Sequence, residues 1–168
     1  MNSADLNLEQ AAQHILSSQY VVALVGAGLS VESGVPTFRG PGGLWTKVGE
    51  PSMNGFQDFV RDPAMWWKEQ QAQQRDLDRT HFREAIERAK PNQGHYALAD
   101  LERMGILRMT ITQNVDDLHA QAGQEMLAEI HGNRTKMRCI SCESRWHRNH
   151  FEGNDYPLTC PDCGGLVK

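Results

Sequence analysis

Short apolar runs alternate with longer segments of helical periodicity along this 168-residue chain. Apolar side chains recur at helical spacing through residues 8–16, and a continuous apolar run at 20–25 follows. Such a run favours a strand buried on both faces of a parallel sheet. Two further short runs, at 106–111 and 127–131, predict a second and a third strand. The alternation predicts an α/β fold with parallel strands joined by right-handed helical crossovers.

Helical patterns fill most of the sequence between the first and second strands. Residues 56–90 follow helical spacing, with a buried side that we expect to comprise Phe56, Phe59, Val60, Trp66 and Trp67. Asn92 is placed to cap a further helix, which Gly105 ends. We expect that helix to turn four side chains toward the core: Tyr96, Leu98, Leu101 and Met104.

Two Cys-x-x-Cys pairs, 17 residues apart, hold all four cysteines of the chain: Cys139 with Cys142 and Cys160 with Cys163. Each pair places two thiolates on one side of a tight turn, and this spacing is typical of a Cys₄ zinc site. The alternative is a pair of disulfides, which secreted proteins favour. A Cys₄ site has no open coordination position, so we expect the zinc to hold a small module together, with Trp146 in its core, and the chemistry to lie elsewhere.

Charge and composition exclude several classes of function. The net charge is −4 and the acidic residues are spread along the chain, which argues against nucleic-acid binding. No apolar run approaches the ~20 residues that cross a bilayer. The segment Met1–Glu9 has two acids and no base, unlike a signal peptide. With thiols on a metal and no export signal, we expect a protein of the reducing cytoplasm, with no membrane partner.

A glycine-containing turn follows the first strand directly. Gly26 and Gly28 allow the backbone to approach a ligand, and a helix starting there would present its N–H groups to an anion. Val31 replaces the third glycine of the dinucleotide fingerprint, and no acid ends a second strand about 20 residues on, so a hydride-transfer dehydrogenase fits poorly. The turn predicts a site for dinucleotide phosphates, the alternative being an ordinary strand-to-helix turn. Three side chains are candidate phosphate donors: Ser30, Ser33 and Arg39.

Polar side chains follow the other two strands where they end. Gln113, Asn114 and Asp116 come after the second strand, and His131 ends the third. Because the carboxyl ends of strands in an open α/β sheet face the ligand crevice, we expect these side chains to meet there. Helix capping by Asn114 or Asp116 is the alternative. His131 is a candidate general base, whereas we expect His95 to serve the core or orient a helix.

Four segments together resemble the sirtuins, which are NAD-dependent protein-lysine deacylases. They are residues 26–40, residues 112–119, the pair His131-Gly132 and the two Cys-x-x-Cys pairs, in the family's order. The resemblance implies a Rossmann-like NAD-binding part at 1–135, with a helical insert at about 51–90, and a zinc-ribbon-like module at 136–168. It also implies NAD and one structural Zn²⁺ as cofactors, and an acyl-lysine protein or peptide as substrate.

The resemblance also implies roles for individual residues. Phe38 would guard the nicotinamide-ribose carbon, Gln113 and Asn114 would contact ribose, and Asp116 would bind the nicotinamide carboxamide. His131 would activate a ribose hydroxyl as general base while the acyl oxygen of the substrate attacks the ribose carbon and nicotinamide leaves. The catalytic group would be His131, Asn114 and Asp116. The NAD contacts would be Gly26, Ala27, Gly28, Ser30, Thr37, Phe38, Arg39, Trp45, Gln113, Asn114, Asp116 and His131.

The sequence departs from the sirtuin pattern at three places. Thr37 stands where many sirtuins have Asp. Residues 66–74 lack the Tyr-x-x-Arg pair of members that remove acidic acyl groups, which favours acetyl or another neutral acyl group. The chain ends at Lys168, where full sirtuins continue with the second half of the nucleotide-binding sheet. We therefore expect an uncovered sheet edge and weak turnover by this chain alone. Two alternatives stay open: an inert NAD-binding or zinc interaction module, and a NAD-dependent ADP-ribosyl transferase.

Overall fold

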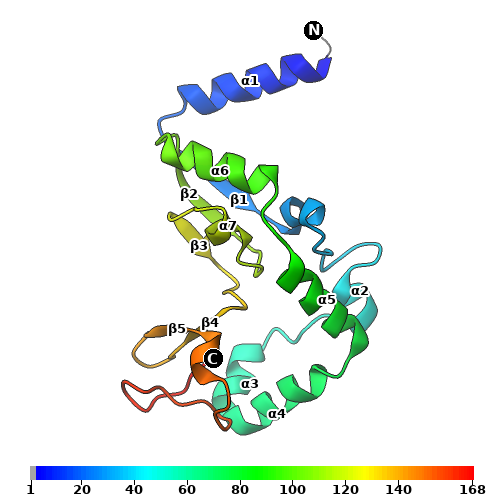
Figure 1. The fold of residues 1–168 in the computed structure, drawn as a ribbon, viewed down its shortest axis with the longest axis vertical. Helices are drawn as coiled ribbons and strands as arrows, with labels where there is room; N and C mark the ends of the chain where they lie inside the picture. Colours follow the sequence, from blue (N-terminus) through cyan, green and yellow to red (C-terminus); the bar gives the residue numbers. More distant parts are fainter. Residues whose placement is uncertain (1–2) are drawn as a thin grey trace.

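The computed structural model describes residues 3–168, with the side chains of the first helix described from Asn7 onward. Parallel strands with intervening helices make up the first part of the chain, in the order α1 (Ser3–Ser17), β1 (Val21–Val25), η1 (Ala27–Ser33), α2 (Leu44–Val48), α3 (Gly55–Arg61), α4 (Pro63–Gln73), α5 (Leu77–Arg88), α6 (Gln93–Arg103), β2 (Leu107–Thr112), α7 (Leu118–Gln121) and β3 (Leu127–Glu129). A smaller module follows, with β4 (Lys136–Arg138), β5 (Arg145–His147) and η2 (Arg148–Phe151). Figure 1 shows this module beside α3 and α4, away from the three-stranded sheet.

Strands β1, β2 and β3 form the predicted parallel sheet. Their order is β1-β2-β3, and all neighbouring pairs are parallel. The register pairs Val25 with Thr112 and Thr112 with Glu129, so the last residues of all three strands lie side by side. The loops that follow these strands therefore start from one edge of the sheet, which confirms the α/β fold predicted from the apolar runs.

Burial of the first strand differs from the prediction. Val25 is buried, but the side chains alternate along β1, and Val22 and Leu24 remain 43% and 71% exposed. The reason is that α6 packs against β2, whereas no helix of the described chain covers the face of β1 that carries Val22 and Leu24. An apolar run thus identified the strand correctly but not the number of its covered faces.

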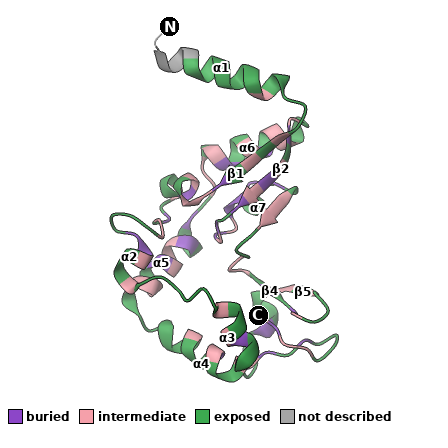
Figure 2. Ribbon diagram, turned by 180° about the vertical axis from the view of Figure 1, so that it is seen from behind, coloured by how far each residue is buried: buried purple, intermediate pink, exposed green. Residues whose placement is uncertain are grey.

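The first helix forms as predicted, yet its apolar stripe is not packed. Leu8 and Leu16 are both exposed, and Ile15 is only partly buried. In Figure 1, α1 extends away from the rest of the chain, and Figure 2 shows it almost entirely exposed. Helical spacing of apolar residues predicts the helix itself, but its contacts depend on which surface lies opposite.

The helices between the sheet strands bury fewer side chains than the periodicity predicts. Phe59 and Trp67 are buried, as expected, but Phe56 and Val60 are about half exposed. These helices contact the zinc module along a narrow seam, so only the residues on that seam are covered. On α6 the prediction of Tyr96 and Met104 as core residues is wrong, because the side that faces β2 is the one that carries His95 and Ala99.

The C-terminal module shares one apolar core with the helical segment. Antiparallel strands β4 and β5 form its hairpin. The buried cluster joins both parts: Phe59, Trp67, Met137, Cys139, Phe151, Leu158, Cys160 and Val167. Trp146, the expected centre of this core, is only partly buried at the margin of the cluster. In the part of the chain that the structure describes, no helix has both the length and the apolar character to cross a membrane.

Candidate functional site: a nucleotide pocket and a zinc centre

The four cysteines converge on one point at the end of the C-terminal module. All four sulfur atoms lie within 4.8 Å of one another, and two of the pairs, Cys139–Cys163 and Cys142–Cys160, are each 3.6 Å apart. A disulfide would hold two sulfurs about 2 Å apart, whereas four thiolates around Zn²⁺ lie about 3.8 Å from one another. The donor set therefore fits one structural Zn²⁺, and the disulfide alternative does not fit.

Backbone hydrogen bonds and neighbouring sulfur atoms shift the pKa values of these thiols. The hydrogen bond from the Cys142 N–H, together with one from the Ser141 N–H, lowers the pKa of Cys139 to about 6. The Gly165 N–H bond also lowers the pKa of Cys163, but the three neighbouring sulfurs raise it to about 12 overall. Four adjacent thiols cannot all ionise without a positive charge among them, so a divalent cation stabilises the whole set as thiolates.

The helix expected after the turn that follows β1 is a 3₁₀-helix. η1 has only seven residues, and Gly34 closes it at φ 85°, a conformation that favours glycine. A helix this short contributes little dipole, so the helix-terminus argument for phosphate binding weakens. The glycines remain informative, because a Cβ atom added at Gly26 or Gly28 would meet no other atom within 4 Å. Packing does not demand glycine there, and the open space is available to a ligand.

A buried polar network ties the turn after β1 to the end of β2. The Ser30 hydroxyl donates to Asp116 Oδ2 at 2.7 Å. Asn114 Nδ2 donates to the Gly26 carbonyl and to Ser30 Oγ, both at 3.1 Å. The Leu118 N–H donates to Asp116 Oδ1 at 3.1 Å. Ser30 is therefore a structural partner of two polar side chains and not the free phosphate donor that the sequence suggested.

Above this network lies a pocket of about 640 Å³, within the range of small-molecule sites. Eight of the twelve residues expected at NAD line it: Ala27, Thr37, Phe38, Arg39, Trp45, Gln113, Asn114 and His131. Ser30 and Asp116 line a much smaller adjoining cavity, which Phe82 and Ile86 close from α5. Sequence reasoning missed Pro51 and Val115, which also line the larger pocket and carry no distinguishing chemistry.

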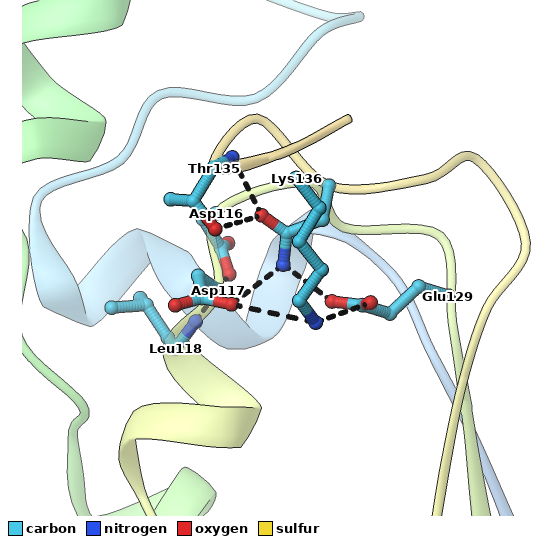
Figure 3. A network of polar contacts seen from close by, with 7 residues as sticks. Asp116, Asp117, Leu118, Glu129, Thr135 and Lys136 are labelled. Carbon is cyan, nitrogen blue, oxygen red and sulfur yellow. Dashed lines mark hydrogen bonds and ion pairs between the residues drawn. The ribbon is translucent and has the colours of Figure 1, made fainter. Parts of the chain in front are cut away.

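His131 lies in the turn after β3, two residues beyond the strand, and is exposed at the pocket. Polar contacts hold the segments on both sides of it (Figure 3). The Asn133 amide donates to the carboxylates of Asp117 and Glu129, and Lys136 Nζ pairs with Glu129 at 2.8 Å. Because residues before and after His131 are tied to the turn that follows β2, the backbone carrying His131 is fixed relative to Asn114 and Asp116.

Aromatic side chains form the wall opposite the strand ends. The Phe38 ring lies 4.8 Å from Trp45 and 4.9 Å from Phe82. The Arg39 guanidinium lies 4.6 Å over the Trp45 ring and donates to Glu50 Oε1 at 2.7 Å. The side-chain hydrogen bond to Glu50 raises the pKa of Arg39, although the pair is exposed to solvent. Arg39 is thus positioned at the pocket by its ion pair with Glu50.

Several supporting residues were not predicted as part of the site. Asn92 Nδ2 donates to the Leu29 carbonyl at 2.7 Å and to Ser33 Oγ at 3.0 Å, which anchors η1 to the start of α6. His95 and His119 are both buried, with ring centroids 5.1 Å apart, as expected of core histidines. No motif in the sequence identifies Asn92 as more than a helix cap, because its second role depends on a contact 63 residues away.

The comparisons with known proteins agree with this geometry. The sequence model of the Sir2 family matches residues 26–168. The NAD-dependent protein deacylase 2 of Pyrobaculum aerophilum is 42% identical over 168 residues, and the NAD-dependent protein deacylase of Pyrococcus furiosus is 38% identical over 166. These matches cover 100% and 96% of this chain but only 60% and 63% of the relatives, so the chain spans about three fifths of their length.

Solved structures show the same likeness. A Sir2 homologue described as a complex with NAD superposes with a TM-score of 0.64 at 38% identity, covering 95% of this chain and 59% of that one. A Sir2 structure with a p53 peptide and NAD⁺ superposes with a TM-score of 0.63 at 28% identity, covering 96% and 62%. With a family match over most of its length and the predicted parallel sheet and cysteine cluster in place, this chain belongs to the Sir2 family.

Proposed function

We propose that this chain carries the NAD-binding and catalytic part of a NAD-dependent protein-lysine deacylase. The observation that supports this most is the buried Ser30–Asn114–Asp116 network, which lies next to a pocket lined by both Gln113 and His131. The names of the archaeal relatives support the same reaction class. Bound NAD would supply the ADP-ribosyl group that accepts the acyl group, with release of nicotinamide.

His131 is the general base of this proposal. Its ring has no hydrogen-bond partner among residues 3–168, and it lines the pocket from the turn after β3. An imidazole with a free ring nitrogen can accept the proton of a ribose hydroxyl. Its anchored backbone limits the positions that the ring can reach, which favours proton transfer at one hydroxyl.

Asn114 and Asp116 orient the nucleotide in this proposal. Both amide hydrogens of Asn114 are used on Gly26 and Ser30, so its carbonyl oxygen remains free to accept from a ribose hydroxyl. Asp116 accepts one bond on each oxygen, and a carboxylate has further lone pairs for the N–H of a carboxamide. Ser30 holds both side chains in these orientations and need not touch the ligand.

The substrate in this proposal is a protein or peptide with an acylated lysine. The absence of a Tyr-x-x-Arg pair in residues 66–74 favours a neutral acyl group such as acetyl. Phe38 and Trp45 provide an apolar wall that would keep water away from the reacting ribose carbon. A reducing compartment such as the cytoplasm belongs to the proposal, because the zinc site requires thiolates.

The test is peptide-dependent release of nicotinamide from NAD by the zinc-loaded chain. We expect release that requires an acetyl-lysine peptide, and a loss of at least about 100-fold in His131→Ala, the usual contribution of a general base. His14→Ala, an exposed histidine on α1, is the matched control and should retain the wild-type rate. Release that ignores the peptide, or that survives His131→Ala, would contradict the proposal.

A further inference from the structure

A second pocket, separate from the NAD pocket, lies where the helical segment meets the zinc module. It has a volume of about 170 Å³ and shares no lining residue with the 640 Å³ pocket. Its lining is almost entirely polar or aromatic: Trp66, Trp67, Gln70, Gln73, Gln74, Arg79, Arg134 and Arg148. This size suits a group of a few atoms and is below that of a drug-sized ligand site.

Three arginines from different parts of the chain converge on this pocket. Arg79 comes from the first turn of α5, Arg134 from the loop between β3 and β4, and Arg148 from η2. None of the three forms an ion pair with a carboxylate among the described residues, whereas other cations of the chain have short ion pairs, such as Lys47 with Asp78 and Lys136 with Glu129, both at 2.8 Å. Glu87, an acid whose charge reaches Arg134, pairs instead with Arg83 at 3.9 Å. Unpaired arginines gathered around one hollow are complementary to an anion.

The surroundings of Arg134 disfavour its charged form. Its side chain is partly buried, and burial lowers the pKa of Arg134. The charges of Arg148 and Arg83 act in the same direction, and the charge of Glu87 opposes them. Among the described residues, one hydrogen bond joins two of the three pocket arginines: Arg148 Nη1 donates to the Arg134 carbonyl at 3.4 Å. A like-charge cluster of this kind lowers the stability of the empty protein and gains stability when a counter-charge enters.

A buried donor in the wall of the same pocket lacks a partner. Trp67 is only 4% exposed, and its indole Nε1–H makes no hydrogen bond within the described chain. Buried indole N–H groups ordinarily have an acceptor. An oxyanion in the pocket would supply acceptor oxygens to the arginines and to a neighbouring indole donor together, whereas a cation would satisfy neither.

We propose that Arg79, Arg134 and Arg148 form a binding site for a phosphate-class oxyanion. The planar guanidinium groups bind phosphate oxygens in pairs, and three of them from separate segments would clamp the anion between the helical segment and the zinc module. The phosphate has two possible sources, a free phosphate ion or a phosphorylated side chain of a protein partner. This site rests on no step of the deacylase proposal and uses none of its residues.

The experiment is a titration of the zinc-loaded chain with inorganic phosphate, followed by NMR of the Trp67 indole N–H. We expect a saturable shift of that resonance, with sodium chloride at matched ionic strength producing none. Arg134→Gln and Arg148→Gln should each weaken binding by about tenfold or more, the usual effect of losing one charged hydrogen bond. Arg145→Gln, an exposed arginine of β5 that lines none of the pockets described above, should leave it unchanged.

Thermal stability gives a second readout that guards against misfolded variants. Removing like-charge repulsion should raise the Tm of Arg134→Gln without phosphate and abolish the phosphate-dependent rise seen in the wild type. A phosphoserine peptide distinguishes the sources: tighter binding than inorganic phosphate assigns a protein ligand, and equal binding assigns the free ion. A shift that does not saturate, or that persists in both Arg134→Gln and Arg148→Gln, overturns the site.

Discussion

At the residue scale, one buried hydroxyl connects two segments that the sequence separates by 86 positions. Ser30 Oγ donates to Asp116 and accepts from Asn114, so it holds both candidate ligand-binding side chains. The sequence placed Ser30 beside a phosphate because serine commonly donates there. Its actual partners depend on the parallel pairing of β1 with β2, which no local pattern around residue 30 reveals.

We predict that Ser30→Ala destabilises the protein by about 1–3 kcal/mol, because a buried carboxylate and a buried amide both lose a partner. NAD affinity should fall as well, since Asn114 and Asp116 would no longer be held in place. Denaturant unfolding measures the first effect and calorimetric titration the second. Ser52→Ala, an exposed serine, should change the free energy of unfolding by less than about 0.5 kcal/mol. Equal effects of the two substitutions would refute this role.

The buried histidine pair predicts acid sensitivity at the residue scale. Burial lowers the pKa of His95, the charge of His119 lowers it further, and the charge of Asp116 opposes both. The folded state therefore holds His95 neutral, whereas the unfolded chain protonates it near pH 6.5. Because the unfolded state then binds more protons, this stability is present above about pH 6.5 and is lost as the pH falls toward the lowered value.

The measurement is urea unfolding at pH 7.5 and pH 5.5 for the wild type and for His95→Gln. We expect the wild type to lose more stability than the variant between these two pH values. Protonation of the zinc thiolates at low pH affects both proteins alike and cancels in the comparison. An identical loss in the two proteins would show that His95 does not cause the acid sensitivity.

At the element scale, the zinc module and helices α3 and α4 depend on each other. Phe59 and Trp67 belong to the same buried cluster as Cys139 and Cys160. The spacing of the four cysteines predicted that they cluster, because a tetrahedral zinc site allows only a few spacings between its ligands. The burial of Phe59 beside an exposed Phe56 could not be predicted, because it depends on where the module docks against α3.

We predict one tightly bound zinc per chain, and loss of the β4–β5 hairpin when a chelator removes it. Structural zinc supplies about 10–16 kcal/mol in zinc-finger peptides, so its removal should unfold the hairpin. α3 and α4 should loosen with it, visible as a loss of near-UV circular dichroism from Trp66 and Trp67. Cys160→Ser should abolish binding of zinc, whereas Asp162→Asn, an exposed residue of the same knuckle, should retain it. A folded, zinc-free module would contradict this account.

At the scale of the whole molecule, the sheet presents an apolar face that the described chain does not cover. Periodicity predicted the strands and their parallel direction, because apolar runs and helical crossovers are local signals. It did not predict that Val22 and Leu24 remain exposed, since burial depends on which elements lie across from a strand. The same reason accounts for the unpacked stripe of α1.

This apolar face predicts self-association of the chain at high concentration. Leu24→Lys should reduce the association seen in sedimentation velocity, because the side chain is 71% exposed and a lysine there remains solvated. The free energy of unfolding should change by less than about 0.5 kcal/mol. A variant that unfolds instead would show that another part of the protein covers this face.

The most direct test of the central claim is calorimetric titration of the zinc-loaded chain with NAD. The account predicts binding at one site, weakened by about tenfold or more in Asn114→Ala, because that residue joins the glycine turn to the pocket. Asn7→Ala, an exposed change on α1, should bind as the wild type does. A folded, zinc-loaded chain that does not bind NAD, or binds it equally well without the Asn114 side chain, would contradict the account.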